Sequence, residues 1–294
     1  MIQFIVSDLD GTLLNEKRQL SKRTIAAIRR VQENKIRLLI NTELDYLEAR
    51  NVLDRADIHC DIACFGGACI FRSNGEKYHA AYLPLKTVPE MLRLFGKHRT
   101  FYEIHSTKGL CVLGTKEGYT NYLEKEAAPF LTQEELSTLS VSEWIQRRIS
   151  QTQFYDTGKQ LFEEHSEIIK ISSRSKDSEK LSNLAQELQC QVPEFVVSNF
   201  DGCRIDVTAA EALKGAALKY YAESHQLSLK ETLVIGDSEN DYSMLALPYV
   251  ESVAMGNADP VIQEICLHHT ASNTEDGAAL VLEQVLSRNM PERI

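Results

Sequence analysis

Two aspartates near the amino terminus are the first residues in the chain that could do chemistry. An apolar run over residues 2–6 leads to Asp8 and Asp10, and Gly11 and Thr12 follow. In an extended backbone, side chains two residues apart project to the same side of the strand. Two carboxylates held this close repel each other unless a cation lies between them or one of them is protonated. The pattern predicts a buried strand that ends in a loop whose two carboxylates could bind a cation. Asp-x-Asp-Gly alone is also typical of a surface turn.

A second acidic pair follows an apolar run late in the chain. Residues 232–235 are typical of a buried strand, and Gly-Asp-Ser-Glu-Asn-Asp occupies positions 236–241. If a helix begins at Ser238, Asp237 and Asp241 are four residues apart and can face one site. Ligands that are all oxygens suit Mg²⁺, which keeps several waters and takes only one or two carboxylates. A metal site is favoured here over a helix that is merely capped by an acidic residue.

Two further side chains could bind a phosphate group. Thr42 follows a predicted strand over residues 36–40, and a hydroxyl before a helix amino terminus can bind phosphate together with backbone N–H groups. Threonine at such a position is more often only a helix cap. Lys214 lies near the start of a predicted amphipathic helix, where it would place a compact cation over a phosphate. Most lysines are instead solvated at the surface.

The elements that position these residues alternate between strand and helix. This alternation holds over residues 1–83 and resumes at 208, which predicts parallel βαβ units with right-handed crossovers. In such sheets ligands bind at the carboxyl ends of the strands. We therefore expect Asp8, Thr42 and Asp237 to lie along one edge of the sheet.

The pattern changes over residues 84–207. This segment contains a predicted helix over 88–97, several adjacent strands and a hairpin about Asn199-Phe200-Asp201-Gly202, while residues 115–167 are polar and weakly patterned. The predicted fold is α/β, with a Rossmann-like parallel-sheet core formed by residues 1–83 and 208–294. An α+β cap domain, residues 84–207, is inserted into it.

Composition excludes several classes of partner. The 294 residues carry a formal net charge of −10, so binding to nucleic acid or to an anionic membrane is not expected. No signal peptide or membrane-spanning apolar stretch is visible, and the seven scattered cysteines indicate reduced thiols, which favours a cytoplasmic location. No coiled-coil seam stands out, and we expect a monomer or a small homo-oligomer.

Taken together, these motifs resemble those of the haloacid dehalogenase-like (HAD) phosphohydrolases. Asp-Leu-Asp-Gly-Thr-Leu-Leu at 8–14 resembles the first motif, Lys-Gly-Ala-Ala-Leu at 214–218 the third, and the stretch at 236–241 the fourth. Residues 254–258 and 275–279 look like the tail of the Cof-type subfamily, which carries an α/β cap between its second and third motifs. The resemblance spans essentially the whole chain.

The resemblance implies a mechanism and a set of site residues. Asp8 attacks phosphorus and forms an aspartyl-phosphate, while Asp10 protonates the leaving oxygen and then deprotonates the attacking water. Mg²⁺ is held by Asp8, by the backbone carbonyl of Asp10 and by Asp237, with Asp241 as a direct ligand or as a holder of metal-bound water. The groups implied for phosphate binding are the Gly11 N–H, Thr42, Lys214 and Asn240.

The implied function is that of a Mg²⁺-dependent phosphatase acting on a small phosphorylated metabolite, such as a sugar phosphate or a cofactor phosphate. Two alternatives stay open. One is a phosphosugar mutase or a sucrose-phosphatase-like enzyme that shares the core. The other is a catalytically weak HAD-fold protein that binds a phosphorylated ligand and regulates. Cap residues around 199–201 could reach the substrate.

The second motif departs from the subfamily pattern. Thr42-Glu43-Leu44 stands where Thr-Gly-Arg is usual, and Gly66-Gly67 stands where Asn-Gly is usual. Glycine would let a backbone N–H approach phosphate without a side chain in the way. Glu43 adds bulk, and a negative charge if it points inward, while Leu44 removes a cation. We expect Glu43 to weaken or redirect substrate binding.

Overall fold

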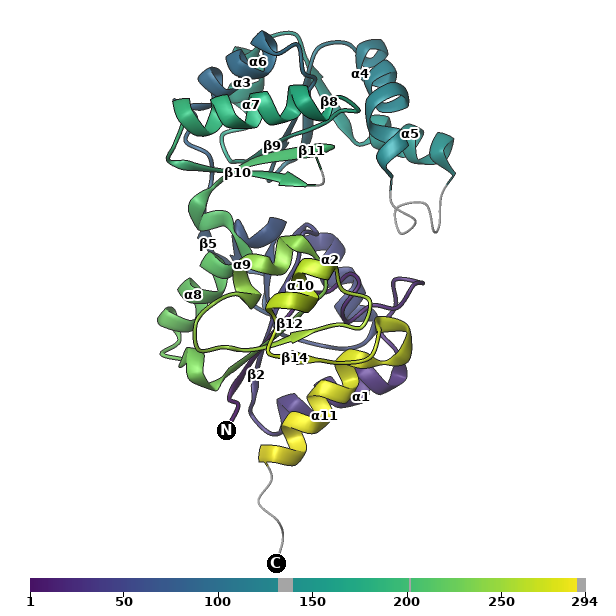
Figure 1. Ribbon diagram of the computed structural model, residues 1–294, viewed down its shortest axis with the longest axis vertical. Coiled ribbons are helices and arrows are strands. Elements are labelled where there is room, and N and C mark those ends of the chain that lie inside the picture. The colour runs from purple at the N-terminus through teal and green to yellow at the C-terminus, as the bar shows by residue number, and fades with distance from the viewer. Residues whose placement is uncertain (132–139, 201, 290–294) are drawn as a thin grey trace, which may run out of the picture. The chain divides into compact units, whose positions relative to one another are not determined.

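The computed structural model describes residues 1–131, 140–200 and 202–289. The chain forms two compact units (Figure 1). The first, here called the core unit, comprises residues 1–80 and 211–294, and the second, here called the insert unit, comprises residues 81–210. Within the described residues, no helix combines the length and the apolarity that crossing a bilayer requires.

The core unit is built on one eight-stranded sheet with the order β14-β13-β12-β1-β2-β3-β4-β5. Strand β1 lies in the middle and pairs in parallel with β2 and with β12. All four residues of β1 are buried, because a central parallel strand is covered on both faces. The predicted parallel-sheet core is confirmed; its parallel strands are β1 (Phe4–Ser7), β2 (Arg37–Asn41), β3 (Asp61–Cys64), β12 (Thr232–Gly236), β13 (Glu251–Ala254) and β14 (His268–His269).

Helices cover both faces of this sheet. One face packs against α1 (Lys22–Glu33), α2 (Tyr46–Arg55) and α11 (Gly277–Asn289). The other face packs against α8 (Lys214–Ser224), α9 (Tyr242–Leu245) and α10 (Pro260–Ile265). Successive side chains of β1 alternate between the two layers, with Ile5 in the first apolar cluster and Phe4 and Val6 in the second.

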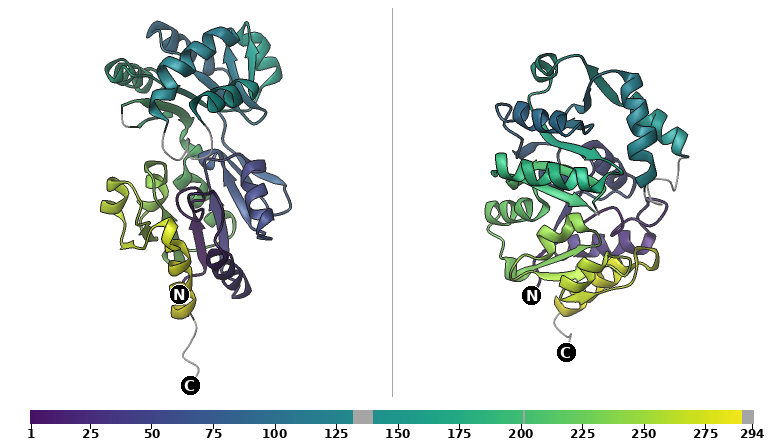
Figure 2. Two further views of the ribbon diagram at one scale, coloured as in Figure 1. Left: turned by 90° about the vertical axis from the view of Figure 1, so that its right-hand side faces the viewer. Right: turned by 45° about the horizontal axis from the view of Figure 1, so that its top comes forward.

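The first and last helices of the core unit lie side by side, although they come from opposite ends of the chain (Figure 2). The Arg23 guanidinium on α1 contacts the Glu283 carboxylate on α11 at 2.7 Å. Helix α1 begins after Ser21, whose side chain caps it by accepting a hydrogen bond from the Thr24 N–H at 3.0 Å. The two helices thus close one layer of the unit.

Some elements of the core unit differ from the prediction. Strands β4 (Cys69–Phe71) and β5 (Lys77–Ala80) extend the sheet in antiparallel fashion and were not predicted. The amphipathic helix predicted around Lys214 begins at that residue, and residues 210–212 form a separate 3₁₀ turn before it. The helix expected from Ser238 is a 3₁₀ turn over 239–241 followed by α9.

The insert unit has a six-stranded, mostly antiparallel sheet with the order β10-β11-β9-β6-β7-β8. Helices α3 (Val88–Lys97) and α7 (Ser178–Gln191) cover its apolar face. The predicted hairpin is confirmed by the pairing of β10 with β11, and its Asp201 lies outside the described residues. The strands are β6 (Glu103–Ser106), β7 (Gly109–Leu113), β8 (Thr152–Tyr155), β9 (Ile168–Arg174), β10 (Phe195–Phe200) and β11 (Arg204–Ala209).

The prediction of little pattern over residues 115–167 is wrong for the described part of that segment. It contains α4 (Lys116–Tyr122), α5 (Val141–Ser150), β8 and α6 (Gly158–Glu164). These elements are short, and α4, α5 and β8 share a small separate cluster of apolar side chains. Two capping boxes, which begin at Ser140 and Thr157, were the sequence signal that could have revealed α5 and α6.

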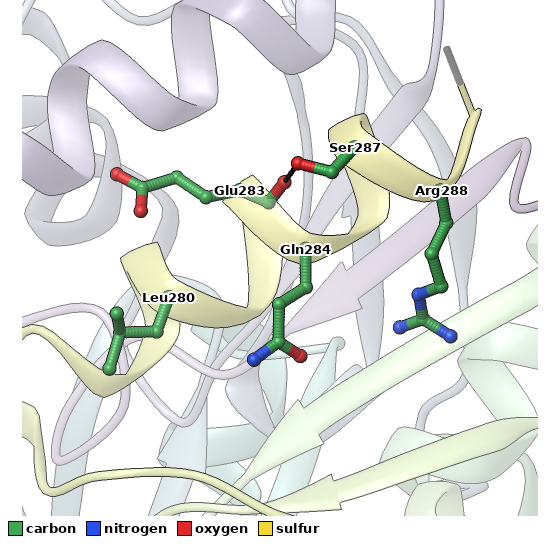
Figure 3. A pocket seen from close by; sticks show the side chains of 5 residues that line it. All are labelled: Leu280, Glu283, Gln284, Ser287 and Arg288. Atoms are coloured by element: carbon green, nitrogen blue, oxygen red, sulfur yellow. Dashed lines mark hydrogen bonds between the residues drawn. The ribbon is translucent and has the colours of Figure 1, made fainter. Parts of the chain in front are cut away.

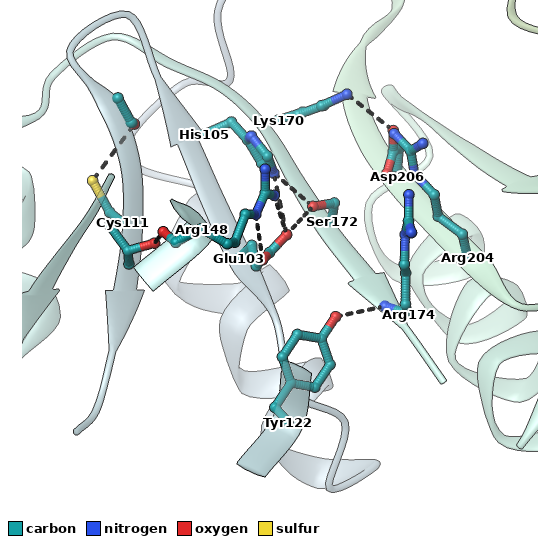
Figure 4. A network of polar contacts seen from close by, with 12 residues as sticks. Glu103, His105, Cys111, Tyr122, Arg148, Lys170, Ser172, Arg174, Arg204 and Asp206 are labelled. Carbon is teal, nitrogen blue, oxygen red and sulfur yellow. Dashed lines mark hydrogen bonds and ion pairs between the residues drawn. The ribbon is translucent and has the colours of Figure 1, made fainter. Parts of the chain in front are cut away.

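The opposite face of the insert sheet carries a polar network around Glu103 (Figure 4). The Glu103 carboxylate contacts the Arg148 guanidinium at 2.8 Å and also accepts a hydrogen bond from the Tyr119 hydroxyl. Burial alone would raise the pKa of Glu103, but Arg148 and His105 outweigh it and hold the pKa well below its usual range. Asp206 lies in the same face and pairs with Lys170 at 3.2 Å.

We predict that Glu103→Gln destabilises the insert unit by about 3 kcal/mol, because it leaves the Arg148 charge unpaired at a largely buried site. Urea unfolding followed by the fluorescence of Trp144, the single tryptophan, measures this. Glu163→Gln is the matched control, because it removes one member of an exposed ion pair with Lys159, and the expected change is below about 1 kcal/mol. Equal effects of the two substitutions would contradict the assignment.

The same network predicts a dependence of stability on pH. A carboxyl whose pKa is lowered on folding contributes stability above its unfolded-state pKa and loses it as the pH falls toward the folded-state pKa. The stability difference between the wild type and Glu103→Gln should therefore be constant above a pH of about 4.5, the usual pKa of glutamate, and shrink below it. A difference that grows on acidification would contradict this.

Candidate active site

Two strand ends bring the predicted aspartates together. Strand β1 ends one residue before Asp8 and pairs in parallel with β12, which ends one residue before Asp237. Carboxylate oxygens of Asp8, Asp237 and Asp241 all lie within 4.8 Å of one another. Asp8 and Asp241 are buried, and Asp237 is partly exposed. Segments more than 220 residues apart in the chain thus form one acidic cluster.

Lys214 lies inside this cluster and is not a solvated surface lysine. Its side chain is only 1% exposed, and its ammonium donates to Asp8 Oδ1 at 2.7 Å and to Asp241 Oδ1 at 2.6 Å. It also donates to Asn240 Oδ1 at 2.9 Å. The start of α8 is held in place by the Asn41 side chain, whose amide donates to the Lys214 carbonyl at 2.9 Å.

Burial and charge shift the ionisation of these groups. Burial raises the pKa of Asp8 well above its usual value; the Lys214 ammonium opposes this shift, and the carboxylates of Asp241 and Asp237 add to it. Burial alone would lower the pKa of Lys214, but the carboxylates of Asp241 and Asp8 raise it instead. With three carboxylates and one ammonium, the cluster has a surplus of negative charge and only oxygen donors, so it is suited to a hard divalent cation.

Short contacts orient the carboxylates. The Thr12 hydroxyl donates to Asp237 Oδ1 at 2.6 Å. Asp241 Oδ2 accepts from the N–H groups of Asp237 at 2.9 Å and of Ser238 at 3.2 Å. Gly11 has a φ of +72°, and a Cβ at this position would lie 2.2 Å from Asp237 Oδ2. Only glycine therefore lets the first loop approach Asp237 this closely.

Asp10 lies beside the cluster and has a different partner. Its carboxylate pairs with the Arg18 guanidinium at 2.9 Å and is not one of the three grouped carboxylates. Burial raises the pKa of Asp10, and Arg18 opposes this shift. Sequence reasoning did not single out Arg18, which lies in a turn with a φ of +53° and carries no motif.

Asn240 and Thr42, the remaining predicted site residues, differ in their contacts. The Asn240 amide oxygen accepts from Lys214, as described above, and from the Ser238 hydroxyl at 3.0 Å. Thr42 is buried at the end of β2, and its hydroxyl accepts from the Leu44 N–H at 3.2 Å. This contact closes a local turn and is not a helix cap, because α2 is capped by Asp45, whose side chain accepts from the Glu48 N–H at 2.8 Å.

An open pocket elsewhere in the core unit contains none of these residues. It lies along α11 (Figure 3). Its two charged groups are already paired, Glu283 with Arg23 and Arg288 with Glu251 at 2.8 Å. This pocket is therefore not the site formed by the predicted residues. It is lined by Leu280, Glu283, Gln284, Ser287 and Arg288.

Comparison with known proteins agrees with this arrangement. Residues 5–282 match the family model described as haloacid dehalogenase-like hydrolase, so the chain belongs to that family. The resemblance seen in the sequence motifs is thereby confirmed.

The named relatives are phosphatases. Phosphatase YwpJ of Bacillus subtilis is 28% identical, with 97% of this chain and 100% of the relative covered. The 5-amino-6-(5-phospho-D-ribitylamino)uracil phosphatase YcsE of the same organism is 23% identical, with coverages of 95% and 93%. A solved haloacid dehalogenase-like hydrolase from B. subtilis has a TM-score of 0.77 at 26% identity, with coverages of 97% and 100%. The chain is accordingly an enzyme of the phosphatase branch of this family.

We predict that Lys214→Met, measured in EDTA, destabilises the core unit by about 3 kcal/mol, because it leaves buried carboxylates without their counter-charge. Hydrogen exchange of the β1 and β12 amides reports the change in this unit. Lys219→Met, at an exposed position of the same helix, is the matched control and should stay within about 0.5 kcal/mol. A Lys214→Met protein as stable as the wild type would contradict this.

Proposed function

We propose that this phosphatase depends on Mg²⁺, hydrolyses small phosphorylated metabolites such as sugar or cofactor phosphates, and works through an aspartyl-phosphate on Asp8. The observation that carries the proposal is the buried contact of Lys214 with Asp8 at 2.7 Å, inside a cluster of three carboxylates. A cation that already touches the attacking carboxylate can also reach a phosphoryl group transferred to it.

The donor set supports Mg²⁺ as the cation. Asp8, Asp237 and Asp241, with the backbone carbonyl of Asp10, would hold it, and all four supply oxygen. When bound, Mg²⁺ neutralises the surplus negative charge of the cluster and polarises the phosphate. Thr12 supports the site indirectly by orienting the Asp237 carboxylate.

The two aspartates of the first loop divide the chemistry. A carboxylate oxygen of Asp8 forms a bond to phosphorus as the ester oxygen leaves, and Asp10 gives that oxygen a proton. Asp10 then takes a proton from a water that attacks phosphorus, which releases phosphate and restores Asp8. Because burial raises the pKa of Asp10, this group holds a proton more readily than an exposed aspartate, as a general acid must.

Four groups bind the phosphate oxygens in this proposal. Lys214 supplies the positive charge, and the remaining donors are neutral hydrogen-bonding groups. The name of the relative YcsE, with its phosphoribityl substrate, supports a small phosphorylated metabolite as the substrate class. The four groups are Lys214, the Thr42 hydroxyl, the Asn240 amide and the Gly11 N–H.

Residues 84–207 act as a cap in this proposal. Water has to be limited while the leaving group departs and admitted for the second step, and a mobile domain can meet both requirements. The separate compactness of residues 81–210 supports this role. The alternatives, a phosphosugar mutase and a catalytically weak regulatory protein, have no particular observation in their favour.

We predict that Asp8→Asn lowers the hydrolysis of p-nitrophenyl phosphate by at least about 10³-fold, because an amide cannot accept the phosphoryl group. Asp57→Asn, at a position with an 80% exposed side chain, is the matched control and should keep the wild-type rate. Turnover near the wild-type rate in the Asp8→Asn enzyme would refute the covalent mechanism.

Removal of the metal gives a second test. EDTA should abolish hydrolysis, and added Mg²⁺ should restore it. Mg²⁺ at about 100 times its dissociation constant should also stabilise the wild type by about 2.7 kcal/mol in thermal unfolding, because it binds only the folded state. The Asp237→Asn variant should lose this stabilisation. Full activity in EDTA would contradict the metal requirement.

A further inference from the structure

Glu43 emerges at the same edge of the sheet as Asp8. It follows Thr42 at the carboxyl end of β2, and β2 pairs in parallel with β1. Asp8 and Lys214 are buried, whereas Glu43 is exposed. Glu43 is therefore a charged group at the rim of this edge that a ligand can reach from solvent.

The Glu43 carboxylate rests on Gly66. A Cβ at Gly66 would lie 2.5 Å from Glu43 Oε1, closer than two such atoms can approach. The turn is tied to the β2 end by two backbone hydrogen bonds of 2.9 Å, from Gly66 N–H to the Thr42 carbonyl and from Phe65 N–H to the Leu44 carbonyl. The two departures from the family pattern, at positions 43 and 66, are thus in contact, and a side chain at 66 would displace the carboxylate from this position.

The same turn connects Glu43 to the buried lysine. A Cβ at Gly67 would lie 2.8 Å from the Leu213 carbonyl oxygen, so the turn packs directly on the residue before Lys214. The Glu43 carboxylate also helps to raise the pKa of Lys214, after the larger effects of Asp241 and Asp8. Its negative charge therefore acts electrostatically on Lys214, the residue proposed to bind the phosphate.

We propose, on the basis of the phosphatase function proposed above, that Glu43 is a specificity-determining residue. It selects phosphate esters whose leaving group carries an ammonium near the phosphate, such as aminoalkyl or amino-sugar phosphates. A cationic group next to the bound phosphate pairs with the rim carboxylate, whereas a second anionic group is repelled by it. A neutral substrate of the same size gains neither effect.

Binding of two phosphonates that cannot be hydrolysed tests this inference separately from catalysis. 2-Aminoethylphosphonate and propylphosphonate differ by an ammonium in place of a methyl group, and titration calorimetry with MgCl₂ present gives both dissociation constants. The preference ratio is the dissociation constant of propylphosphonate divided by that of 2-aminoethylphosphonate. This ratio should be about three- to fivefold larger for the wild type than for the Glu43→Gln variant, the size expected for a partly exposed ion pair. Comparison between variants cancels intrinsic differences between the two ligands.

Two further variants sharpen the test. Glu33→Gln removes the same charge just before β2 begins, at the opposite edge of the sheet, and should keep the wild-type ratio. Glu43→Asp keeps the charge and should retain part of the preference. The same ratio in the wild type and in Glu43→Gln overturns the inference, and so does the absence of binding by either phosphonate. Failure of the wild type to hydrolyse p-nitrophenyl phosphate would overturn the proposed function instead.

Discussion

The site depends on one buried ammonium shared between carboxylates. Lys214, 1% exposed, contacts Asp8 and Asp241, and removing its ammonium would leave these buried carboxylates without their counter-charge. Three segments distant in the sequence therefore have to be held together with little freedom: the end of β1, the start of α8 and the turn after β12. A parallel sheet with helices on both faces provides this, because its strand ends and helix starts share one edge.

Small residues make the close approach possible. Gly11 lies against the Asp237 carboxylate, and a Cβ at Gly215 would lie only 2.0 Å from the Ser243 carbonyl oxygen, so α8 can approach the start of α9. The result is a closely packed cluster with a surplus of negative charge. A divalent cation would balance that surplus. The exposed Glu43 carboxylate adds a further negative charge at the same edge of the sheet, which would favour a positively charged ligand group.

Much of this could be predicted from the sequence. The meeting of Asp8 and Asp237 followed from a physical rule, because the carboxyl ends of neighbouring parallel strands meet at one edge of a sheet. The burial of Lys214 did not, since its helix pattern suits a surface lysine equally well, and only the resemblance to a known motif pointed to a site. The partnership of Asp10 with Arg18 depends on the path of a loop, which local patterns do not determine.

The insert unit was harder to predict, because some of its helices also depend on contacts between residues distant in the sequence. Its strands β9, β10 and β11 are apolar enough to be found by alternation, whereas α4 and α5 form around a small aromatic cluster that only tertiary contacts create. The ion pair of Glu103 with Arg148 joins residues 45 positions apart, on a strand and on a helix that the sequence pattern did not indicate. The helix capping box that begins at Ser140 was present in the sequence, and it could have been used to predict α5.

The central claim is that Asp8 and Asp237 share one divalent cation next to Lys214. A crystal structure grown with Mn²⁺ in place of Mg²⁺, with the anomalous signal of manganese recorded, tests it most directly. The account predicts one strong anomalous peak bonded to carboxylate oxygens of both Asp8 and Asp237, and its loss in the Asp237→Asn variant. A peak that contacts neither residue, or one that persists unchanged in that variant, would contradict it.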